Sequence, residues 1–268
     1  MKTKLVLALI VLALCSVTFA QSPSPNRVTR QQAVPAICSF SFTSGSGNTY
    51  LNYCVTPSGN IFYIETPKGH LQLGHFSVAE GYGVCDATAN VEYHDYAGFG
   101  NSGNWNSPVL LSQSATSVKI ARTTSDGIWT LTQTITQVAA SSSIKIVMTL
   151  KNNTAAARDV YLVRYAAVDA DSQALNNLDA TQNSAAGWNS HGITDHSYGL
   201  QLQNVGNPQF SYWNGFAQNI PGGPNACAFA FNSPGTVITA TDGSLVMAYV
   251  DTMPVHGSKT VTLNYKGF

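Results

Sequence analysis

Residues Trp129 to Val138 read WTLTQTITQV, and Ser143 to Lys151, which follow after a short connector, read SIKIVMTLK. In both stretches apolar residues alternate with polar or charged ones. The polar face of the first stretch consists of Thr130, Thr132, Thr134 and Thr136. The apolar face of the second consists of Ile144, Ile146, Met148 and Leu150, and Lys145 and Lys151 lie opposite. A period of two with many β-branched residues is typical of half-buried antiparallel strands, so these stretches predict two neighbouring strands.

The rest of the chain continues this pattern in shorter stretches, while helical periodicity is nearly absent. Strands are predicted at residues 37–43, 49–56, 60–66, 71–76, 84–93, 109–113, 117–122, 160–168, 198–203, 226–231, 245–250 and 260–266. Turn-forming sequences such as residues 125–127 (SDG) and 57–60 (PSGN) separate several of them. Many short strands with regular turns indicate an all-β protein, a large antiparallel β-sandwich forming a single domain over residues 37–268.

The N-terminal residues predict export. Lys2 and Lys4 precede an unbroken apolar run over residues 5–14, and small residues at Thr18 and Ala20 favour cleavage after Ala20. The apolar run is shorter than the roughly 20 residues that a membrane span needs. Lipidation at Cys15 is the alternative, but bulky Leu14 stands where a lipobox has a small residue. We therefore expect a signal peptide over residues 1–20, a disordered leader over 21–36, and a secreted or periplasmic protein without a membrane span.

Charge is sparse in this sequence. The full chain has 13 basic and 13 acidic residues, and cleavage after Ala20 removes two lysines. The charged fraction is 10 %, against about 25 % in ordinary globular domains. A chain without clustered Lys and Arg offers no basis for nucleic-acid binding. We expect a neutral surface of hydroxyls and carboxamides.

Four cysteines remain after the expected cleavage, and an even number in an exported chain predicts two disulfides. The hairpin predicted around residues 44–48 would place Cys38 directly opposite Cys54, within disulfide range. Cys85 would then pair with Cys227. A slipped register would give another of the three possible pairings. No CxxC spacing supports a metal site in place of the disulfides.

Several of these stretches resemble a known family. They are RTTSDGIWTLTQT (122–134), IKIVMTLKNNT (144–154), RDVYLVRYAAVDAD (158–171) and PVHGSKTVTLNY (254–265). Their order resembles the large β-sandwich, or supersandwich, of galactose-mutarotase-like domains and of polysaccharide-active enzymes. EGYGVCD at 80–86 is similar to a stretch shared by uncharacterised exported bacterial β-sandwich proteins. We match no mutarotase His and Glu pair onto the chain, so the resemblance implies a fold and no activity.

Two long stretches without alternation, residues 93–106 and 169–196, are expected to be irregular loops that carry function. In the second loop Asp169, Asp171, Asn177 and Asp179 supply the hard oxygen ligands that Ca²⁺ prefers. They do not follow the EF-hand pattern. The alternative is an Asp- and Asn-rich loop whose side chains bond its own backbone.

His191, Asp195 and His196 form a second candidate, as zinc ligands or as a general base held by an acid. The alternative is a loop with solvent-exposed histidines. Glu80 and Asp95 form a third candidate, an acid–base carboxylate pair joined by the tertiary structure. Asp86 and Glu92 would share one face of a strand about 20 Å apart, too far to act as that pair.

Aromatic and carboxamide side chains in the two loops form the fourth candidate. Tyr96, Trp105 and Trp188 could stack on sugar rings, and Asn104 could bond sugar hydroxyls. The alternative places several of these rings in the core. Neither a G-x-S-x-G elbow nor a Walker loop is present in the sequence.

The leading hypothesis is an exported β-sandwich that binds carbohydrate or another extracellular partner, with calcium as an expected cofactor. One alternative is a polysaccharide-acting hydrolase or lyase that uses loop carboxylates. Another is an extracellular subunit that assembles through its neutral, threonine-rich sheet face. The sequence leaves open whether the protein is an enzyme.

Overall fold

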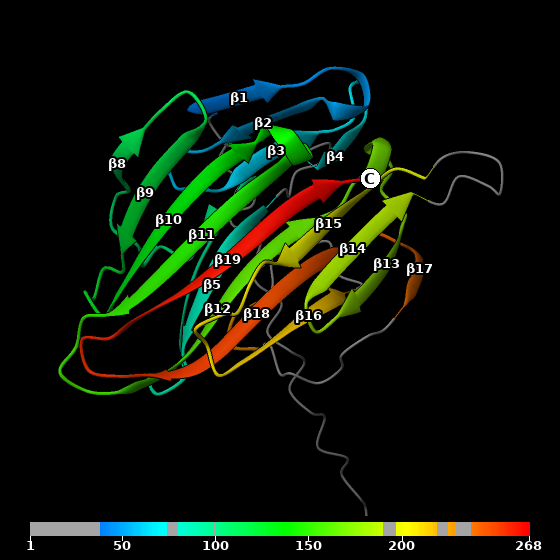
Figure 1. The fold of residues 1–268 in the computed structure, drawn as a ribbon. Helices are drawn as coiled ribbons and strands as arrows, with labels where there is room; N and C mark the ends of the chain where they lie inside the picture. The colour runs from blue at the N-terminus through cyan, green and yellow to red at the C-terminus, as the bar shows by residue number, and fades with distance from the viewer. Residues whose placement is uncertain (1–37, 74–79, 99, 190–196, 219–224, 229–236) are drawn as a thin grey trace, which may run out of the picture.

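A computed structural model of the chain describes residues 38–73, 80–98, 100–189, 197–218, 225–228 and 237–268. The predicted signal peptide and leader lie outside these residues, as do His191, Asp195 and His196. Three antiparallel sheets account for nearly all of the described secondary structure (Figure 1). In the described parts of the chain, no helix has the length and apolar character to span a membrane.

The nine-stranded sheet forms one layer. In spatial order it contains β17 (Ile238–Thr241), β13 (Asn176–Thr181), β14 (Ser184–Asn189), β15 (Gly199–Asn204), β19 (Ser258–Gly267), β11 (Ser143–Asn152), β10 (Trp129–Val138), β9 (Ser117–Thr123) and β8 (Val109–Gln113). The predicted alternation is confirmed in β10, where buried and half-buried residues alternate along all ten positions. The apolar face of β11 is buried as well, and Lys145 and Lys151 are exposed.

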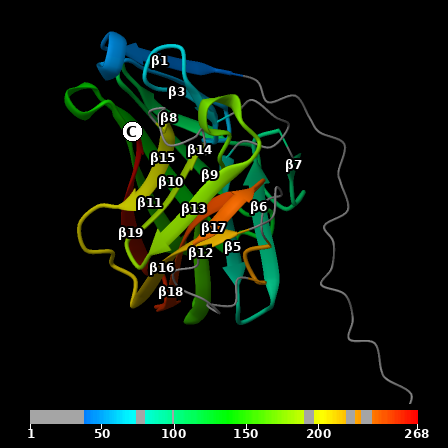
Figure 2. The ribbon, with the colours of Figure 1, turned by 90° about the vertical axis from the view of Figure 1, so that its right-hand side faces the viewer.

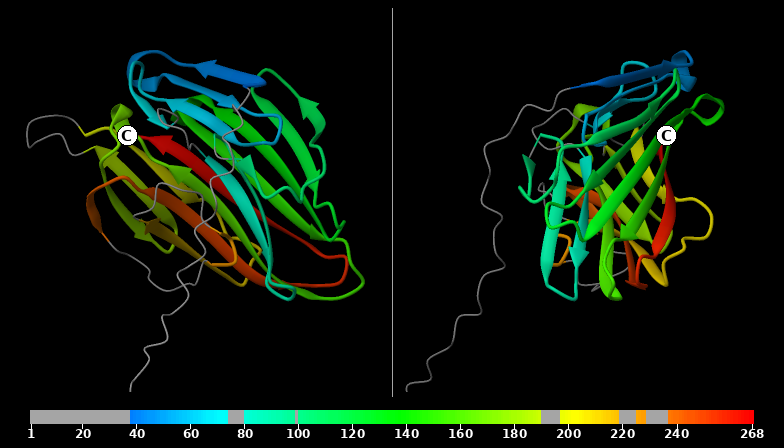
Figure 3. Two further views of the ribbon diagram at one scale, coloured as in Figure 1. Left: turned by 180° about the vertical axis from the view of Figure 1, so that it is seen from behind. Right: turned by 90° about the vertical axis from the view of Figure 1, so that its left-hand side faces the viewer.

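The six-stranded sheet forms the second layer, on the far side of the molecule in Figure 1 and toward the viewer in the left panel of Figure 3. Its order is β16 (Tyr212–Gln218), β18 (Ser244–Met253), β12 (Arg158–Ala167), β5 (Glu80–Asp86), β6 (Val91–Tyr96) and β7 (Gly100–Asn101). The main core lies between the two large sheets, because the inward-facing residues of β10, β11, β12, β18 and β19 belong to one buried cluster. The predicted antiparallel β-sandwich is therefore confirmed.

A four-stranded sheet lies across one end of the two layers (Figure 2). It contains β1 (Phe40–Ser44), β2 (Leu51–Val55), β3 (Ile61–Glu65) and β4 (Leu71–Leu73). Its buried residues Leu51, Tyr53 and Ile64 join the same core cluster. This sheet closes one end of the sandwich and brings the β3–β4 turn beside the nine-stranded sheet.

Several expectations about the strands are wrong. Residues 226–228, the described part of the strand predicted at residues 226–231, form a turn, and residues 93–96 of the predicted irregular loop belong to β6. Residues 84–93 do not form one strand, because the chain turns back after Asp86 and β5 and β6 form a hairpin. Asn90 takes a positive φ of 53° in that turn, a conformation that Asn tolerates. Glu92 pairs with Cys85, so Glu92 and Asp86 lie on opposite faces of the six-stranded sheet.

The segment 169–196 was expected to be irregular, and this is also wrong for its described part. Residues 176–189 form the hairpin of β13 and β14, whose buried positions are, apart from Leu178, small or polar: Asn176, Ala180, Ala185, Gly187 and Asn189. A polar and glycine-containing buried face hides the period of two from a hydrophobicity pattern. β16 and β17 were not predicted for the same reason, since neither alternates in hydrophobicity.

Both predicted disulfides are present, Cys38–Cys54 and Cys85–Cys227, with Cα–Cα distances of 5.6 and 5.0 Å. The expected register of the first hairpin is wrong, however. Ser41 is the Cα partner of Cys54, and Cys38 reaches Cys54 from just before β1 begins. Ser44 pairs with Leu51, so the hairpin is centred between residues 47 and 48 and not at Ser46. This shift moves the expected partner of Cys54 from Cys38 to Ser41.

An ion pair joins the two large sheets, between β18 and the start of β19. Lys259 of β19 pairs with Asp251 of β18, whose carboxylate also accepts hydrogen bonds from the backbone and hydroxyl of Ser211, at 2.8 and 3.0 Å. Burial alone would raise the pKa of the Asp251 carboxyl. The bonds from Lys259 and Ser211 outweigh burial and lower that pKa below its ordinary value of 3.8.

The substitution Asp251→Asn should lower the free energy of unfolding by about 1–3 kcal/mol at pH 7, because it removes a charge-assisted bond between the sheets. A carboxyl whose folded pKa is depressed stabilises the fold above its unfolded pKa. That stabilisation is lost as the pH falls through the folded value. The difference between wild type and variant, measured by urea unfolding from pH 7 to pH 3, should therefore shrink below about pH 4.

The matched control is Asp159→Asn on the neighbouring strand β12, where the carboxylate is exposed and accepts a bond from Thr252. It should change stability by no more than about 0.5 kcal/mol at any pH. A wild-type advantage over Asp251→Asn that stays constant down to pH 3 would contradict the assignment.

Candidate functional site

Glu80 and Asp95, the predicted carboxylate pair, lie on adjacent strands and face the interior between the sheets. The backbone N–H of Ala97 bonds the carbonyl of Glu80, so Asp95 lies diagonally across from Glu80, at a Cα separation of roughly 7–8 Å. Glu80 is fully buried and pairs with Arg164. Asp95 pairs with Arg122 and accepts a 2.5 Å bond from Asn60. The structure brings the two carboxylates together, but each is already paired with a buried cation.

The surroundings of Glu80 show a structural role for this residue. Its carboxylate accepts bonds from the backbone N–H of Ile61 at 2.7 Å and from the hydroxyl of Tyr265 at 3.0 Å. Burial raises the pKa of Glu80 to about 7, although Arg164 and these bonds act in the opposite direction. A perturbed carboxyl inside the core without a cleft beside it is a weak candidate for catalysis.

Tyr96 lies on the other face of the six-stranded sheet, under a segment stapled by the Cys85–Cys227 disulfide. Its ring stacks on His94 and lies 5.4 Å from the ring of Tyr165. Nδ1 of His94 is 3.1 Å from Glu92, which also accepts a 2.8 Å bond from the backbone of Ala226. Tyr96 is therefore part of a second small core and is not exposed to a ligand.

The other two predicted ligand-binding residues in this region also have structural contacts. Trp105 packs edge-on against Tyr82, and the guanidinium of Arg122 lies 5.2 Å above its ring. Asn104 donates a 2.8 Å bond to the carbonyl of Glu92 and accepts one from Ser102. Both residues fix the loop between β7 and β8 against the sandwich.

The predicted calcium ligands Asp169, Asp171, Asn177 and Asp179 are distributed over two elements. The first two lie at the 3₁₀ helix η3 (Ala170–Ser172), and the other two lie on the outward face of β13. Asn177 accepts a 3.2 Å bond from the backbone of Ala240, and Asp179 accepts one from Ala180. Within the described ranges, no group of three or more His, Cys, Asp or Glu side chains is placed to hold a metal ion. Calcium at this loop stays a prediction.

An accessible cluster of reactive side chains lies where the β3–β4 turn meets η3 and β15. Nδ1 of His70 is 2.8 Å from Oδ1 of Asp171, and the imidazole stacks on the ring of Tyr198 with a centroid distance of 3.7 Å. The side chains of His70 and Asp171 are 29 % and 28 % exposed. This pair differs from the buried carboxylates because a dissolved molecule can reach it.

Backbone bonds explain why residues 101 positions apart meet here. The backbone N–H of Asp169 donates to the carbonyl of Gln72 in β4, which anchors η3 next to the turn that carries His70. The buried Asn176 holds the same segment by accepting from Ala170 at 3.1 Å and donating to the carbonyls on either side of η3. The site therefore depends on Asn176, which the sequence presents as one of the oxygen ligands of the Asp- and Asn-rich stretch and which here has structural bonds.

The backbone at the pair is strained. Asp171 has a φ of 55° and Ser172 a φ of 61°, so two consecutive non-glycine residues adopt the left-handed conformation. Such residues cost roughly 1–3 kcal/mol each and persist where the surrounding structure holds them. The strain turns the carboxylate of Asp171 toward His70 and favours a functional role for the pair.

The Asp171 contact also determines the chemistry of the imidazole. A carboxylate only accepts, so Nδ1 of His70 carries a hydrogen and Nε2 keeps a free lone pair. In the described structure Nε2 has no hydrogen-bond partner. A half-exposed imidazole with its second nitrogen free can accept a proton or a hydrogen bond from a hydroxyl group.

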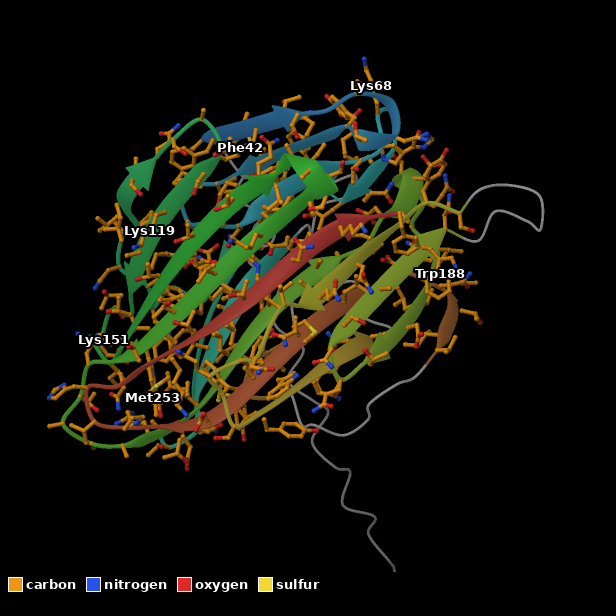
Figure 4. All side chains as sticks on the ribbon, in the orientation of Figure 1. Phe42, Lys68, Lys119, Lys151, Trp188 and Met253 are labelled. Carbon is orange, nitrogen blue, oxygen red and sulfur yellow. A yellow bond between two sulfur atoms is a disulfide. The ribbon has the colours of Figure 1, made fainter. Side chains whose placement is uncertain are left out.

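Two aromatic rings lie on the other side of the same strand ends. Trp188 is the Cα partner of Gly199 in β15, and the ring of Phe268 lies 2.5 Å from the place where a Cβ of Gly199 would stand. Opposite positions in a sheet have Cβ atoms about 4.5–5.5 Å apart, so Trp188 and Phe268 are neighbours. Phe268 is 51 % exposed and Trp188 is half-buried. Figure 4 labels Trp188 on β14 at the edge of the molecule.

We call His70, Asp171, Trp188, Tyr198 and Phe268 the end cluster. Asp171 and Trp188 were predicted, for calcium and for sugar binding respectively. His70 and Tyr198 were missed, because each is a single residue beside a turn and nothing in their spacing links them. Only the closure of the four-stranded sheet onto β15 brings them together.

Searches of known proteins connect the fold to carbohydrate-related structures. A bacterial glucoamylase complexed with acarbose matches with a TM-score of 0.56 and 9 % identity, over 88 % of this chain and 33 % of that chain. This chain thus spans a third of the glucoamylase's length. A GalM/aldose epimerase homologue from C. elegans matches with a TM-score of 0.46 and 9 % identity, over 86 % and 99 % of the two chains.

A putative aldose 1-epimerase from Escherichia coli K12 matches with a TM-score of 0.39 and 10 % identity, over 85 % and 99 % of the two chains. The glucoamylase match agrees with the expected large β-sandwich fold. At these identities the likeness concerns the fold alone. A scan of protein-family models and a search of curated proteins found no match.

The neutral ring of His70 should carry its hydrogen on Nδ1, which ¹⁵N chemical shifts from a two-bond ¹H–¹⁵N NMR spectrum report directly. Removing the carboxylate with Asp171→Gly should abolish this preference, because the acceptor is gone. Glycine adopts a positive φ without strain, so this variant keeps the backbone of η3. A wild-type spectrum showing hydrogen on Nε2 would contradict the assignment.

Proposed function

We propose that the protein binds carbohydrate at the end cluster. The observation that carries the proposal is the pairing of a half-exposed His70–Asp171 couple with aromatic rings on both sides of the β14 and β15 ends. Sugar recognition combines aromatic faces, which stack on the pyranose ring, with polar groups that bond the hydroxyls. The two kinds of group flank the ends of β14 and β15 from opposite faces, so a bound saccharide would contact both by reaching around these strand ends.

A buried acceptor near the cluster supports the same proposal. Gln72, two residues after His70, is fully buried, and its side-chain nitrogen donates to the carbonyl of Thr66 at 2.8 Å. Its oxygen has no hydrogen-bond partner. An unsatisfied buried acceptor is costly, and a hydroxyl group that enters beside β4 could satisfy it.

The comparisons give further support at the level of the fold. The glucoamylase with the similar domain is complexed with acarbose. We also carry forward the expectation of export, because the two disulfides fit an oxidising compartment. A glycan in that compartment would be the partner that the low surface charge suits.

Proton transfer on a sugar is a second candidate function, and the free Nε2 of His70 favours it. An imidazole oriented by a carboxylate is a general base within reach of solvent. A hydroxyl of a bound sugar could give its proton to Nε2, while Asp171 stabilises the resulting imidazolium. This reading keeps the binding site and adds a reaction to it.

Neutral gluco-, galacto- and xylo-oligosaccharides should be titrated against the protein by calorimetry and by tryptophan fluorescence. We expect binding by at least one of them, and Trp188→Ala should weaken it about tenfold or more because a stacking ring is lost. His70→Ala should weaken it as well. The matched control is Trp213→Phe on β16, since Trp213 is also partly exposed but bonds Asn183 away from the cluster.

Binding that survives both Trp188→Ala and His70→Ala would place the sugar elsewhere. An absence of heat and of fluorescence change across the whole panel would contradict the proposal. Sugar anomer exchange or product release that requires His70 would instead establish the second candidate function.

A further inference from the structure

Charge is divided unequally between the two large sheets. The nine strands of the larger sheet contain six basic residues and one acidic residue, Asp179. The six strands of the smaller sheet contain two basic and six acidic residues. A chain with a formal charge of zero therefore has a basic layer and an acidic layer.

The cations that face the interior are paired with carboxylates. Arg122 pairs with Asp95, and Lys259 pairs with Asp251, in both cases across the two sheets. The remaining basic residues of the nine-stranded sheet are Lys119, Lys145, Lys151 and Lys266. All four are exposed, and none of them has an ion-pair partner in the described structure.

These four lysines lie on the outward face of the sheet. Lys119 is the Cα partner of Thr134, Lys145 of Thr136, and Lys151 of Thr130; these threonines form the half-exposed face of β10. Lys266 pairs with Ser143 and lies diagonally across from Lys145, roughly 7–8 Å away between Cα atoms. Figure 4 labels Lys119 and Lys151 on this part of the sheet.

Hydroxyl and carboxamide groups fill the spaces between the lysines. They are Ser117, Thr123, Thr130, Thr132, Thr134, Thr136, Thr149, Thr260, Thr262, Asn264, Gln201 and Gln203. Several are bonded to one another across strands, such as Thr123 with Thr130 at 3.0 Å and Thr149 with Thr260 at 2.8 Å. We call this surface, with its four lysines, the lysine–threonine face.

We infer that the lysine–threonine face binds an acidic polysaccharide. The four exposed lysines, with no carboxylate beside them, make this face complementary to an anionic polymer, and the hydroxyl rows between them fit a chain whose charges are separated by hydroxyl-bearing rings. A nucleic acid has a phosphate every few ångströms and is usually held by arginines and stacking aromatic rings, which these positions lack. Lys145 and Lys151 are six residues apart on one strand, about 20 Å, so the face suits an extended polymer rather than a single sugar.

The surface is separate from the end cluster, so it goes beyond the proposed function. The two regions adjoin where β19 ends, because Lys266 lies two residues before Phe268 and pairs with Gln201 of β15. A glycan with acidic units could follow β11 and β19 and end at Trp188. The basic face would then hold the chain, and the end cluster would bind its terminal sugar.

The test is co-sedimentation and affinity electrophoresis of the full chain with polygalacturonate, compared with its methyl ester as the neutral polymer. We expect retention by polygalacturonate that disappears at roughly 1 M salt, where the Debye length falls to about 3 Å. The variant with Lys119, Lys145, Lys151 and Lys266 changed to Gln should lose at least about tenfold in affinity for polygalacturonate, because four exposed charge contacts are removed. Lys68→Gln is the matched control, since Lys68 is an exposed lysine in the β3–β4 turn, away from the lysine–threonine face (Figure 4).

Unchanged thermal unfolding of the four-lysine variant would show that it folds, and a circular dichroism melt measures this. Retention of that variant equal to wild type, binding of the methyl ester as tight as binding of the acid, or tighter binding to DNA than to polygalacturonate would each overturn the inference. A failure of neutral-sugar binding with intact polyanion binding would count against the end cluster alone.

Discussion

The ion pair between Arg164 and Glu80 is the interaction on which the three sheets converge. Both residues are fully buried in the six-stranded sheet. The guanidinium also bonds the side chain of Gln133 in β10, and the carboxylate accepts the hydroxyl of Tyr265 in β19, so both bond the nine-stranded sheet. Ile61 of β3 donates its backbone N–H to Glu80, which attaches the four-stranded sheet. Removing one partner of such a pair typically costs about 3–5 kcal/mol, because the other charge stays buried.

The Arg164–Glu80 pair is one of four ion pairs that contain a buried carboxylate. Three more buried carboxylates have cationic partners: Asp95 with Arg122, Asp86 with Arg158, and Asp251 with Lys259. A buried charge must be paired and hydrogen-bonded, and these four ion pairs use eight of the 26 charged residues of the chain. The outward faces are then left to threonine, asparagine and glutamine, with the lysines of one sheet as the main exceptions.

The sequence predicted the parts of the fold that depend on hydrophobic alternation. β10 and β11 alternate cleanly because one face is core and the other is solvent, and the disulfides followed from the number and compartment of the cysteines. The β13–β14 hairpin escaped because Asn176 and Gly187 take positions where a core strand usually has apolar residues. Asn176 is buried there because it bonds the segment around η3. A polar residue that is required by the tertiary structure interrupts the hydrophobic alternation from which strands are predicted.

The end cluster shows the same limit for function. Asp171 and Trp188 could be selected from composition, but the partner of Asp171 lies 101 residues earlier, on another sheet. Their meeting depends on the buried ion pair, because the bond from Ile61 to Glu80 holds β3 on the sandwich and the β3–β4 turn follows directly. β3 thus connects the buried Glu80, which Ile61 bonds at the start of the strand, with the turn after the strand that carries His70. The sequence does not show this connection, because Glu80 and Ile61 meet only in the folded protein.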